Sequence, residues 1–128
     1  MLSTYTPMPT LAVKDLDAAR QFYEGVLGFT PAADTDGGVR YAAGSGEVLV
    51  YTSAYAGTNK ATAVSFPVPP EAFEEEVAAL RDRGVNFQTF DMEGATWSDG
   101  VATMGNEMAV WFEDPDGNIL NLWATTQG

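Results

Sequence analysis

Two segments with helical periodicity, each followed by a glycine, constrain the fold of this chain more than any other feature. In residues 16–27 apolar side chains recur every three or four positions, and Asp15 stands where a helix N-cap is expected. Gly28 follows where a C-terminal cap belongs, and a second such segment ends before Gly84. The apolar face of the second segment consists of Phe73, Val77 and Leu80. We therefore expect two amphipathic helices.

Short alternating segments, typical of β-strands, surround each predicted helix. One strand precedes each helix and three follow it, so the order β-α-β-β-β occurs twice. The expected strands cover residues 8–13, 29–33, 39–43, 48–52, 61–67, 86–90, 108–112 and 119–124, and residues 97–104 add an edge or a hairpin arm. We expect one α+β domain, residues 1–128, in which two βαβββ repeats (about 5–58 and about 60–126) form a cup-shaped mixed sheet with helices on its outer face.

The composition excludes several classes of site. The 128 residues include neither cysteine nor histidine, which excludes disulfides, thiolate nucleophiles and the commonest transition-metal ligand. The net charge of −12 repels nucleic acid and anionic membranes and attracts cations. The alternative interpretation is that this charge only keeps the protein soluble. No apolar run reaches the about 20 residues of a membrane span, and no signal peptide is visible. We expect a cytoplasmic protein with no nucleic-acid or membrane partner.

The segment Asp-Pro-Asp-Gly-Asn at residues 114–118 is the sharpest local signal. Proline at its second position and glycine at its fourth favour a type I turn that joins two strands. Its two carboxylates allow a metal-binding interpretation. We interpret it instead as a solvated hairpin turn.

Two motifs, one near each end of the chain, occur together in a known group of proteins. The first is Val-Lys-Asp-Leu-Asp-Ala-Ala-Arg at residues 13–20, followed by Phe-Tyr at 22–23 and Leu-Gly-Phe at 27–29, and the second is the Asp-Pro-Asp-Gly-Asn turn. With these motifs the chain resembles the vicinal oxygen chelate superfamily, which includes glyoxalase I, extradiol dioxygenases, fosfomycin-modifying enzymes and bleomycin-resistance proteins. The resemblance covers nearly the whole chain. It indicates the fold more than the function, because one fold hosts many activities.

Enzymes of that superfamily hold a divalent metal with four side chains, and the resemblance implies where these stand here. The four positions are Met8, Val50 (or Tyr51, if the register shifts by one), Ala61 and Asn121. A thioether, hydrocarbon side chains and one amide do not supply the three or four nitrogen or oxygen donors that such a metal needs. The resemblance is therefore to a branch that lacks the metal ligands, and we expect no metal and no cofactor.

If the four positions face the cup, strand alternation predicts the rest of the lining. The lining is then mostly small and apolar with large tryptophans, which suits a flat or apolar small molecule. The alternative is that these side chains fill the cup and leave no pocket. Alternate positions such as Leu11, Leu120 and Phe112 are expected in the core. The predicted pocket residues are Met8, Thr10, Val50, Ala61, Ala63, Trp97, Trp111, Asn121, Trp123 and Tyr55.

From these features we expect a metal-free protein that binds an aromatic or cationic small molecule, of antibiotic type, in the cup. The alternative is an enzyme (an isomerase, lyase or hydrolase) that uses a carboxylate such as Glu107 or Glu113, or a tyrosine, for proton transfer. A metal enzyme with relocated ligands is a third interpretation, which the lack of histidine disfavours. The resemblance also implies a homodimer.

Overall fold

The computed structural model describes residues 1–125, which fold as two compact units. The first unit comprises Met1–Ala63 with Asp114–Asn118, and the second comprises Val64–Glu113 with the segment that starts at Ile119. Thr126, where the second repeat is expected to end, lies outside the described residues. No helix in residues 1–125 is both long and apolar enough to cross a lipid bilayer.

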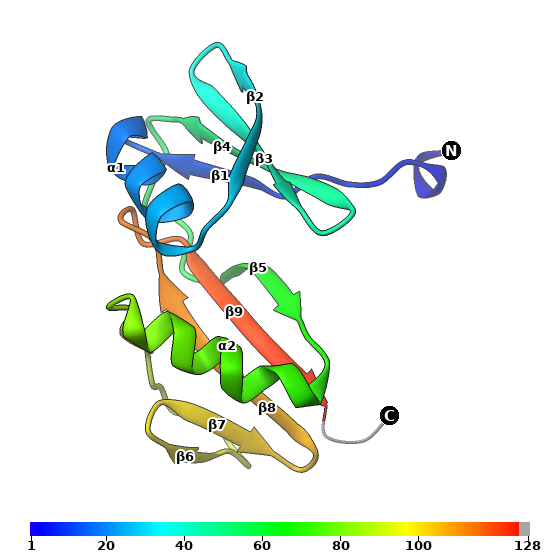
Figure 1. Ribbon diagram of the computed structural model, residues 1–128, viewed down its shortest axis with the longest axis vertical. Helices are drawn as coiled ribbons and strands as arrows, with labels where there is room; N and C mark the ends of the chain where they lie inside the picture. Colours follow the sequence, from blue (N-terminus) through cyan, green and yellow to red (C-terminus); the bar gives the residue numbers. More distant parts are fainter. Residues whose placement is uncertain (126–128) are drawn as a thin grey trace. The chain divides into compact units, whose positions relative to one another are not determined.

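The first unit contains a mixed sheet with the strand order β1-β4-β3-β2 (Figure 1). Its strands are β1 (Thr10–Val13), β2 (Thr30–Thr35), β3 (Gly38–Ala43) and β4 (Gly46–Thr52). β1 runs parallel to β4, whereas β4, β3 and β2 are successive antiparallel neighbours. Alternation along the strands gives one buried apolar face, made of Leu11, Val13, Val39, Tyr41, Val48 and Val50.

The first helix begins and ends at the caps that the sequence predicts. Asp15 accepts hydrogen bonds from two backbone N–H groups of the first turn of α1 (Leu16–Arg20), which continues as a π-helical segment, η2 (Gln21–Val26). Gly28 then adopts a φ of 77°, a left-handed conformation that glycine tolerates without a steric penalty. A short 3-10 helix, η1 (Leu2–Thr4), precedes β1.

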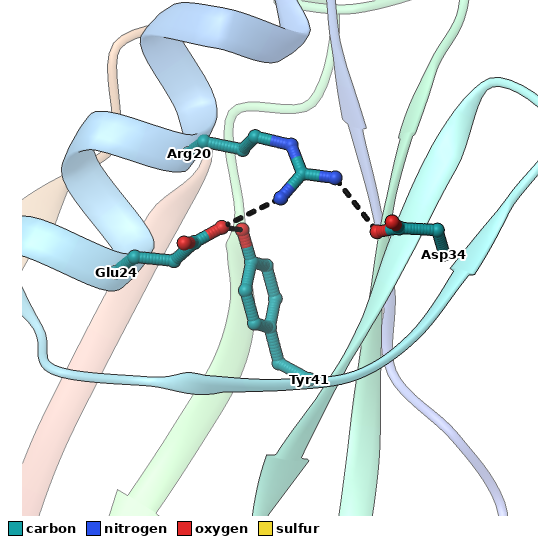
Figure 2. A network of polar contacts seen from close by, with 4 residues as sticks. All are labelled: Arg20, Glu24, Asp34 and Tyr41. Atoms are coloured by element: carbon teal, nitrogen blue, oxygen red, sulfur yellow. Dashed lines mark hydrogen bonds and ion pairs between the residues drawn. The ribbon is translucent and has the colours of Figure 1, made fainter.

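A polar network ties this helix to the hairpin of β2 and β3 (Figure 2). The Arg20 guanidinium bridges the carboxylates of Glu24 (3.0 Å) and Asp34 (2.7 Å), and the Tyr41 hydroxyl donates to the same Glu24 oxygen (2.8 Å). Burial, together with the Glu24 carboxylate, raises the pKa of Tyr41, so the hydroxyl stays protonated as a donor. Since each member is paired with another, the network serves to hold the helix on the sheet.

The turn at residues 114–118 belongs to the first unit, and it is not the solvated turn that we expect from the sequence alone. Asp114 is 5% exposed and Asn118 is 6% exposed. The Asp114 carboxylate accepts hydrogen bonds from the Tyr23 hydroxyl (2.7 Å) and the Asn118 amide (2.8 Å), and Asn118 also donates to the Ala12 carbonyl (2.8 Å). The expectation is wrong because a tyrosine far away in the sequence buries and pairs with the carboxylate.

The second unit is built on a five-stranded sheet with the order β5-β9-β8-β7-β6. Helix α2 (Pro70–Asp82) lies across β8 and β9 (Figure 1), and its Phe73 and Val77 pack in one cluster with Val110, Leu122 and Ala124. The strands are β5 (Thr62–Pro67), β6 (Thr96–Ser98), β7 (Val101–Met104), β8 (Glu107–Glu113) and β9 (Ile119–Thr125). The predicted α+β class is confirmed.

The second unit lacks the strand predicted at residues 86–90. A single backbone hydrogen bond, from the Gln88 N–H to the Trp111 carbonyl (2.8 Å), joins this segment to β8. β7 pairs with that edge of β8 only as far as Ala109, and one bond to the edge beyond it does not make a ladder. The hairpin expected at residues 97–104 is present as β6 and β7.

Candidate functional site

The three tryptophans of the chain lie on one face of the second unit's sheet, the face opposite α2. Trp111 and Trp123 alternate along β8 and β9 with Val110 and Leu122, which pack against the helix. Because successive side chains of a strand point to opposite faces, both rings point away from α2. Trp97, on β6, shares that face through its cross-strand neighbours.

Two alanines form the floor between these rings. Trp97 pairs with Ala102 on β7, and Ala102 pairs with Ala109 on β8. Ala109 pairs in turn with Trp123, so the four residues form one row across the sheet. Neighbouring strands are about 4.8 Å apart, which separates the two outer backbones by about 14 Å. Since alanine carries only a methyl group, the row is low in the middle and high at its ends. Ala102 is fully buried, whereas Ala109 lines a pocket.

A pocket of about 200 Å³ opens on this face. Pockets for drug-sized ligands measure about 300–1,000 Å³, so this one has room for a small ring system. Its lining consists of Met104, Glu107, Met108, Ala109, Trp111, Asn121 and Trp123.

The pocket contains two polar side chains. Asn121 is 5% exposed, and its amide nitrogen donates to the Val110 carbonyl (3.2 Å), which orients the amide. Glu107 is exposed, and among residues 1–125 it has no basic partner. A carboxylate beside aromatic rings favours a cation, because charge-assisted hydrogen bonds and cation–π contacts act together.

A cluster of aromatic rings lies beside the pocket. The Trp111 ring centroid lies 5.0 Å from that of Phe90 and 6.1 Å from that of Trp97, and the Phe90 and Trp97 centroids are 5.5 Å apart. Phe90 belongs to the irregular segment 86–90 and is 44% exposed. Phe90, Trp97 and Trp111 are therefore in mutual contact.

The pocket residues predicted from the sequence do not include Phe90, Ala102 or Ala109. Ala109 lies two positions before Trp111 on the same strand, so the alternation that places Trp111 on the open face also places Ala109 there. No comparable signal exists for Phe90, because nothing in residues 86–90 specifies which distant rings they contact.

Val50 does not share a face with the other pocket residues predicted in the first unit. It pairs with Leu11 on β1 and is 0% exposed, in the core. Thr10 and Ala12 are on the opposite face, where Tyr51 pairs with Ala12. The choice of Val50 is wrong by one residue, because the register of β4 against β1 is a tertiary feature that neither strand encodes alone.

Two further predicted residues of the first unit lie at its surface. Met8 is 38% exposed and lines another cavity, of about 640 Å³, beside Arg40 and Glu47. Thr10 is exposed, and its hydroxyl donates to the Met8 carbonyl (3.1 Å). Arg40 donates two hydrogen bonds to Glu47, so the charged groups of this cavity neutralise each other.

The remaining predicted residues lie in and after the loop that precedes β5. Tyr55 is 78% exposed, and Ala61 is exposed with its N–H donating to the Asn59 side chain (3.0 Å). Ala63 is half-buried on β5, where it alternates with the residues that face α2. Of the predicted pocket residues, the structure brings together four on the second unit's open face: Trp97, Trp111, Asn121 and Trp123.

Comparison with known families identifies the fold. The model of the Glyoxalase/Bleomycin resistance protein/Dioxygenase superfamily matches residues 6–122. This chain belongs to that superfamily. The match includes both motifs that carry the resemblance, at residues 13–29 and 114–118. No curated protein sequence matches the chain.

Several solved structures are similar to this member of the superfamily. The glyoxalase family protein from Enterococcus faecalis is 20% identical with a TM-score of 0.71, over 96% of this chain and 99% of that chain. The fosfomycin resistance protein FosX from Listeria monocytogenes, complexed with Mn(II) and sulfate, is 15% identical with a TM-score of 0.71, over 97% and 92%. A glyoxalase/bleomycin resistance protein/dioxygenase from Nocardioides is 18% identical with a TM-score of 0.66, over 97% and 87%. At these levels of sequence identity, the similarity establishes a shared fold and does not establish a shared function.

The metal site of the superfamily does not fit the side chains of this member. At the positions that the resemblance assigns to the ligands stand the Met8 thioether, the Ala61 methyl group and the Asn121 amide, and the fourth position is Val50 or, in the register of the structure, Tyr51. Tyr51, one position after Val50, adds only one phenol oxygen. Within residues 1–125 no three carboxylates are grouped as metal ligands. We therefore assign no chemistry of this chain to a metal.

Proposed function

We propose that this chain binds a small, flat, cationic molecule on the tryptophan-lined face of its second unit. One observation carries the proposal: Trp111 and Trp123 line a pocket together with Ala109 and the Glu107 carboxylate, and Trp97 contacts Trp111 on the same face. Indole rings bind flat ligands by stacking and bind cations through the ring face. The carboxylate pairs with the positive group of the ligand, and the net charge of −12 attracts it from a distance.

We propose that this binding requires no metal, since the side chains at the superfamily's ligand positions do not supply suitable donors. The superfamily's description includes bleomycin resistance proteins, and FosX is a fosfomycin resistance protein. An antibiotic-like ligand therefore agrees with the proposal. We also propose that the protein is cytoplasmic, as its composition favours, and that it is a homodimer, as the superfamily resemblance implies. Sedimentation equilibrium tests the dimer.

The intrinsic fluorescence of the unmodified protein tests the proposal, because Trp111 and Trp123 line the pocket and Trp97, the third tryptophan, contacts Trp111. We expect benzamidine, a flat cation, to bind more tightly than benzamide, its neutral counterpart. Ala109→Leu fills the floor and should abolish benzamidine binding, whereas Ala78→Leu, on the exposed surface of α2, should not affect it. Equal affinity for the two compounds, or unchanged binding by Ala109→Leu, would contradict the proposal.

The metal-free part of the proposal has its own control. Dialysis against EDTA should leave the affinity for benzamidine unchanged. Loss of binding after EDTA treatment, with recovery on addition of Mn²⁺, would show that a metal takes part after all.

Glu107 also favours a second candidate, an isomerase, lyase or hydrolase in which this carboxylate transfers a proton. Glu113 has less support, because it is not part of the pocket lining. Glu107→Gln separates the two candidates. In a binding protein it should weaken binding of benzamidine but not of benzamide, whereas in an enzyme it should abolish turnover of a neutral substrate that still binds.

A further inference from the structure

We propose that Phe90 occupies a second ring subsite, in contact with both Trp97 and Trp111, and that a ligand with several fused rings displaces it. This inference rests on the proposed function and adds the size of ligand that the site accepts.

The geometry of the three rings supports a subsite at this position. Phe90 lies at an interplanar angle of 69° to both indole rings, with centroid distances of 5.5 Å to Trp97 and 5.0 Å to Trp111. Such edge-type contacts are a favoured arrangement of aromatic pairs. A ligand ring in the place of Phe90 would therefore meet the same two indole surfaces.

Phe90 is held weakly compared with the two tryptophans, which stand on paired strands. It is 44% exposed, and residues 85–95 contain no regular secondary structure. The Gln88 N–H to Trp111 carbonyl bond connects the segment to the sheet, and Phe87 packs against the core cluster three residues before Phe90. Segments with few buried contacts and few backbone hydrogen bonds open at low free energy, so Phe90 is able to leave while Phe87 stays anchored.

Displacement of Phe90 would extend the pocket, because Trp111 borders both the pocket and the Phe90 contact. The present volume of about 200 Å³ is small for a ligand of several rings. Asp91 and Glu93 follow Phe90 on the same segment and are both exposed, so the enlarged site would still favour a cation. Phe90 thus sets the upper size limit of the ligand.

Two cations of different size test this inference by tryptophan fluorescence titration. Benzamidine has one ring, and proflavine has three fused rings. Phe90→Ala should raise the affinity for proflavine roughly tenfold, because the ligand no longer has to break two ring contacts, and should change the affinity for benzamidine by less than about twofold. Phe90→Leu, which keeps the apolar bulk, should give a smaller rise in the same direction. Tyr5→Ala, which removes an exposed ring in the first unit, is the matched control and should change neither affinity.

Hydrogen exchange of the unmodified protein provides a second readout. Proflavine should accelerate exchange of the Gln88 amide by opening the segment, whereas benzamidine should not. An unchanged or lower proflavine affinity in both Phe90 variants, with benzamidine still bound, overturns this inference and leaves the proposed function standing. Protection of Gln88 by proflavine also overturns it. Failure of every protein to bind either cation overturns the proposed function, and this inference with it.

Discussion

Tyr23 and Asp114 are 91 positions apart in the sequence, and the Tyr23 hydroxyl oxygen lies 2.7 Å from a carboxylate oxygen of Asp114. Both residues are buried. The carboxylate also accepts hydrogen bonds from the Asn118 side chain and from two backbone N–H groups of its own turn. A buried acceptor that loses a donor costs more free energy than a typical hydrogen bond contributes. This pair should therefore be a sensitive point of the first unit.

We predict that Tyr23→Phe lowers the free energy of unfolding by about 1–3 kcal/mol at neutral pH, because the Asp114 carboxylate stays buried with one donor fewer. Urea denaturation measures this difference. Tyr5→Phe removes the same hydroxyl from a residue that is 73% exposed, and it should have no effect. Equal stabilities of the Tyr23→Phe variant and the unmodified protein would show that water replaces the lost donor.

The same substitution should alter the dependence of stability on pH. Burial, and then the Asp114 carboxylate, raise the pKa of Tyr23 in the folded state, whereas in the unfolded chain tyrosine ionises near pH 10. The stabilising contribution of Tyr23 is thus complete below about pH 10 and is lost as the pH rises above that value. The stability difference between the two proteins should shrink between about pH 9 and about pH 11. Tyr41 is present in both proteins, so its own raised pKa cancels from the comparison.

At the scale of elements, both helices end at glycines for a reason of backbone geometry. Gly84, after α2, has a φ of 87°, and an added Cβ would meet no atom within 4 Å. A side chain there would therefore cause conformational strain but no clash. Gly25, inside η2, is equally unobstructed, and its φ is not positive. The two glycines thus differ only in backbone conformation.

We predict opposite effects of alanine at these two glycines. Gly84→Ala should lower the free energy of unfolding by about 1–2 kcal/mol, the cost of a left-handed conformation for a residue with a Cβ. Gly25→Ala should raise it by about 0.5–1 kcal/mol, because alanine loses less backbone freedom than glycine on folding. Urea denaturation of the two variants gives both values, and effects of the same sign would contradict this explanation.

At the scale of the whole molecule, the excess of negative charge affects every cationic ligand. The chain has 18 acidic and 6 basic side chains. Their summed field extends beyond any single ion pair and is screened over about 10 Å at 0.1 M salt. Part of the affinity for a cation should therefore depend on salt and should not depend on Glu107 alone.

We predict that raising the salt concentration from about 0.05 M to about 0.5 M weakens benzamidine binding by roughly threefold and leaves benzamide binding unchanged. Fluorescence titration at each salt concentration measures both. In Glu107→Gln the salt dependence should be reduced and not abolished, since the other carboxylates remain. Benzamidine binding that is independent of salt would restrict the electrostatic contribution to direct contacts.

Features that depend only on neighbouring residues could be predicted from the sequence. Asp15 and Gly28 mark the ends of the first helix because caps act within one helical turn. Trp111 and Phe112 point to opposite faces because alternation is a property of a single strand. The superfamily motifs are likewise contiguous, so the fold followed from them.

Features that depend on pairing between distant segments could not be predicted in this way and were seen first in the folded chain. The tertiary structure placed Val50 in the core and Tyr51 beside Ala12, buried Asp114 against Tyr23, and left residues 86–90 without a strand. Phe90 meets its two tryptophans for the same reason. Register and side-chain contact between segments are set by the summed packing of the whole unit, and the local pattern of either segment is compatible with more than one outcome.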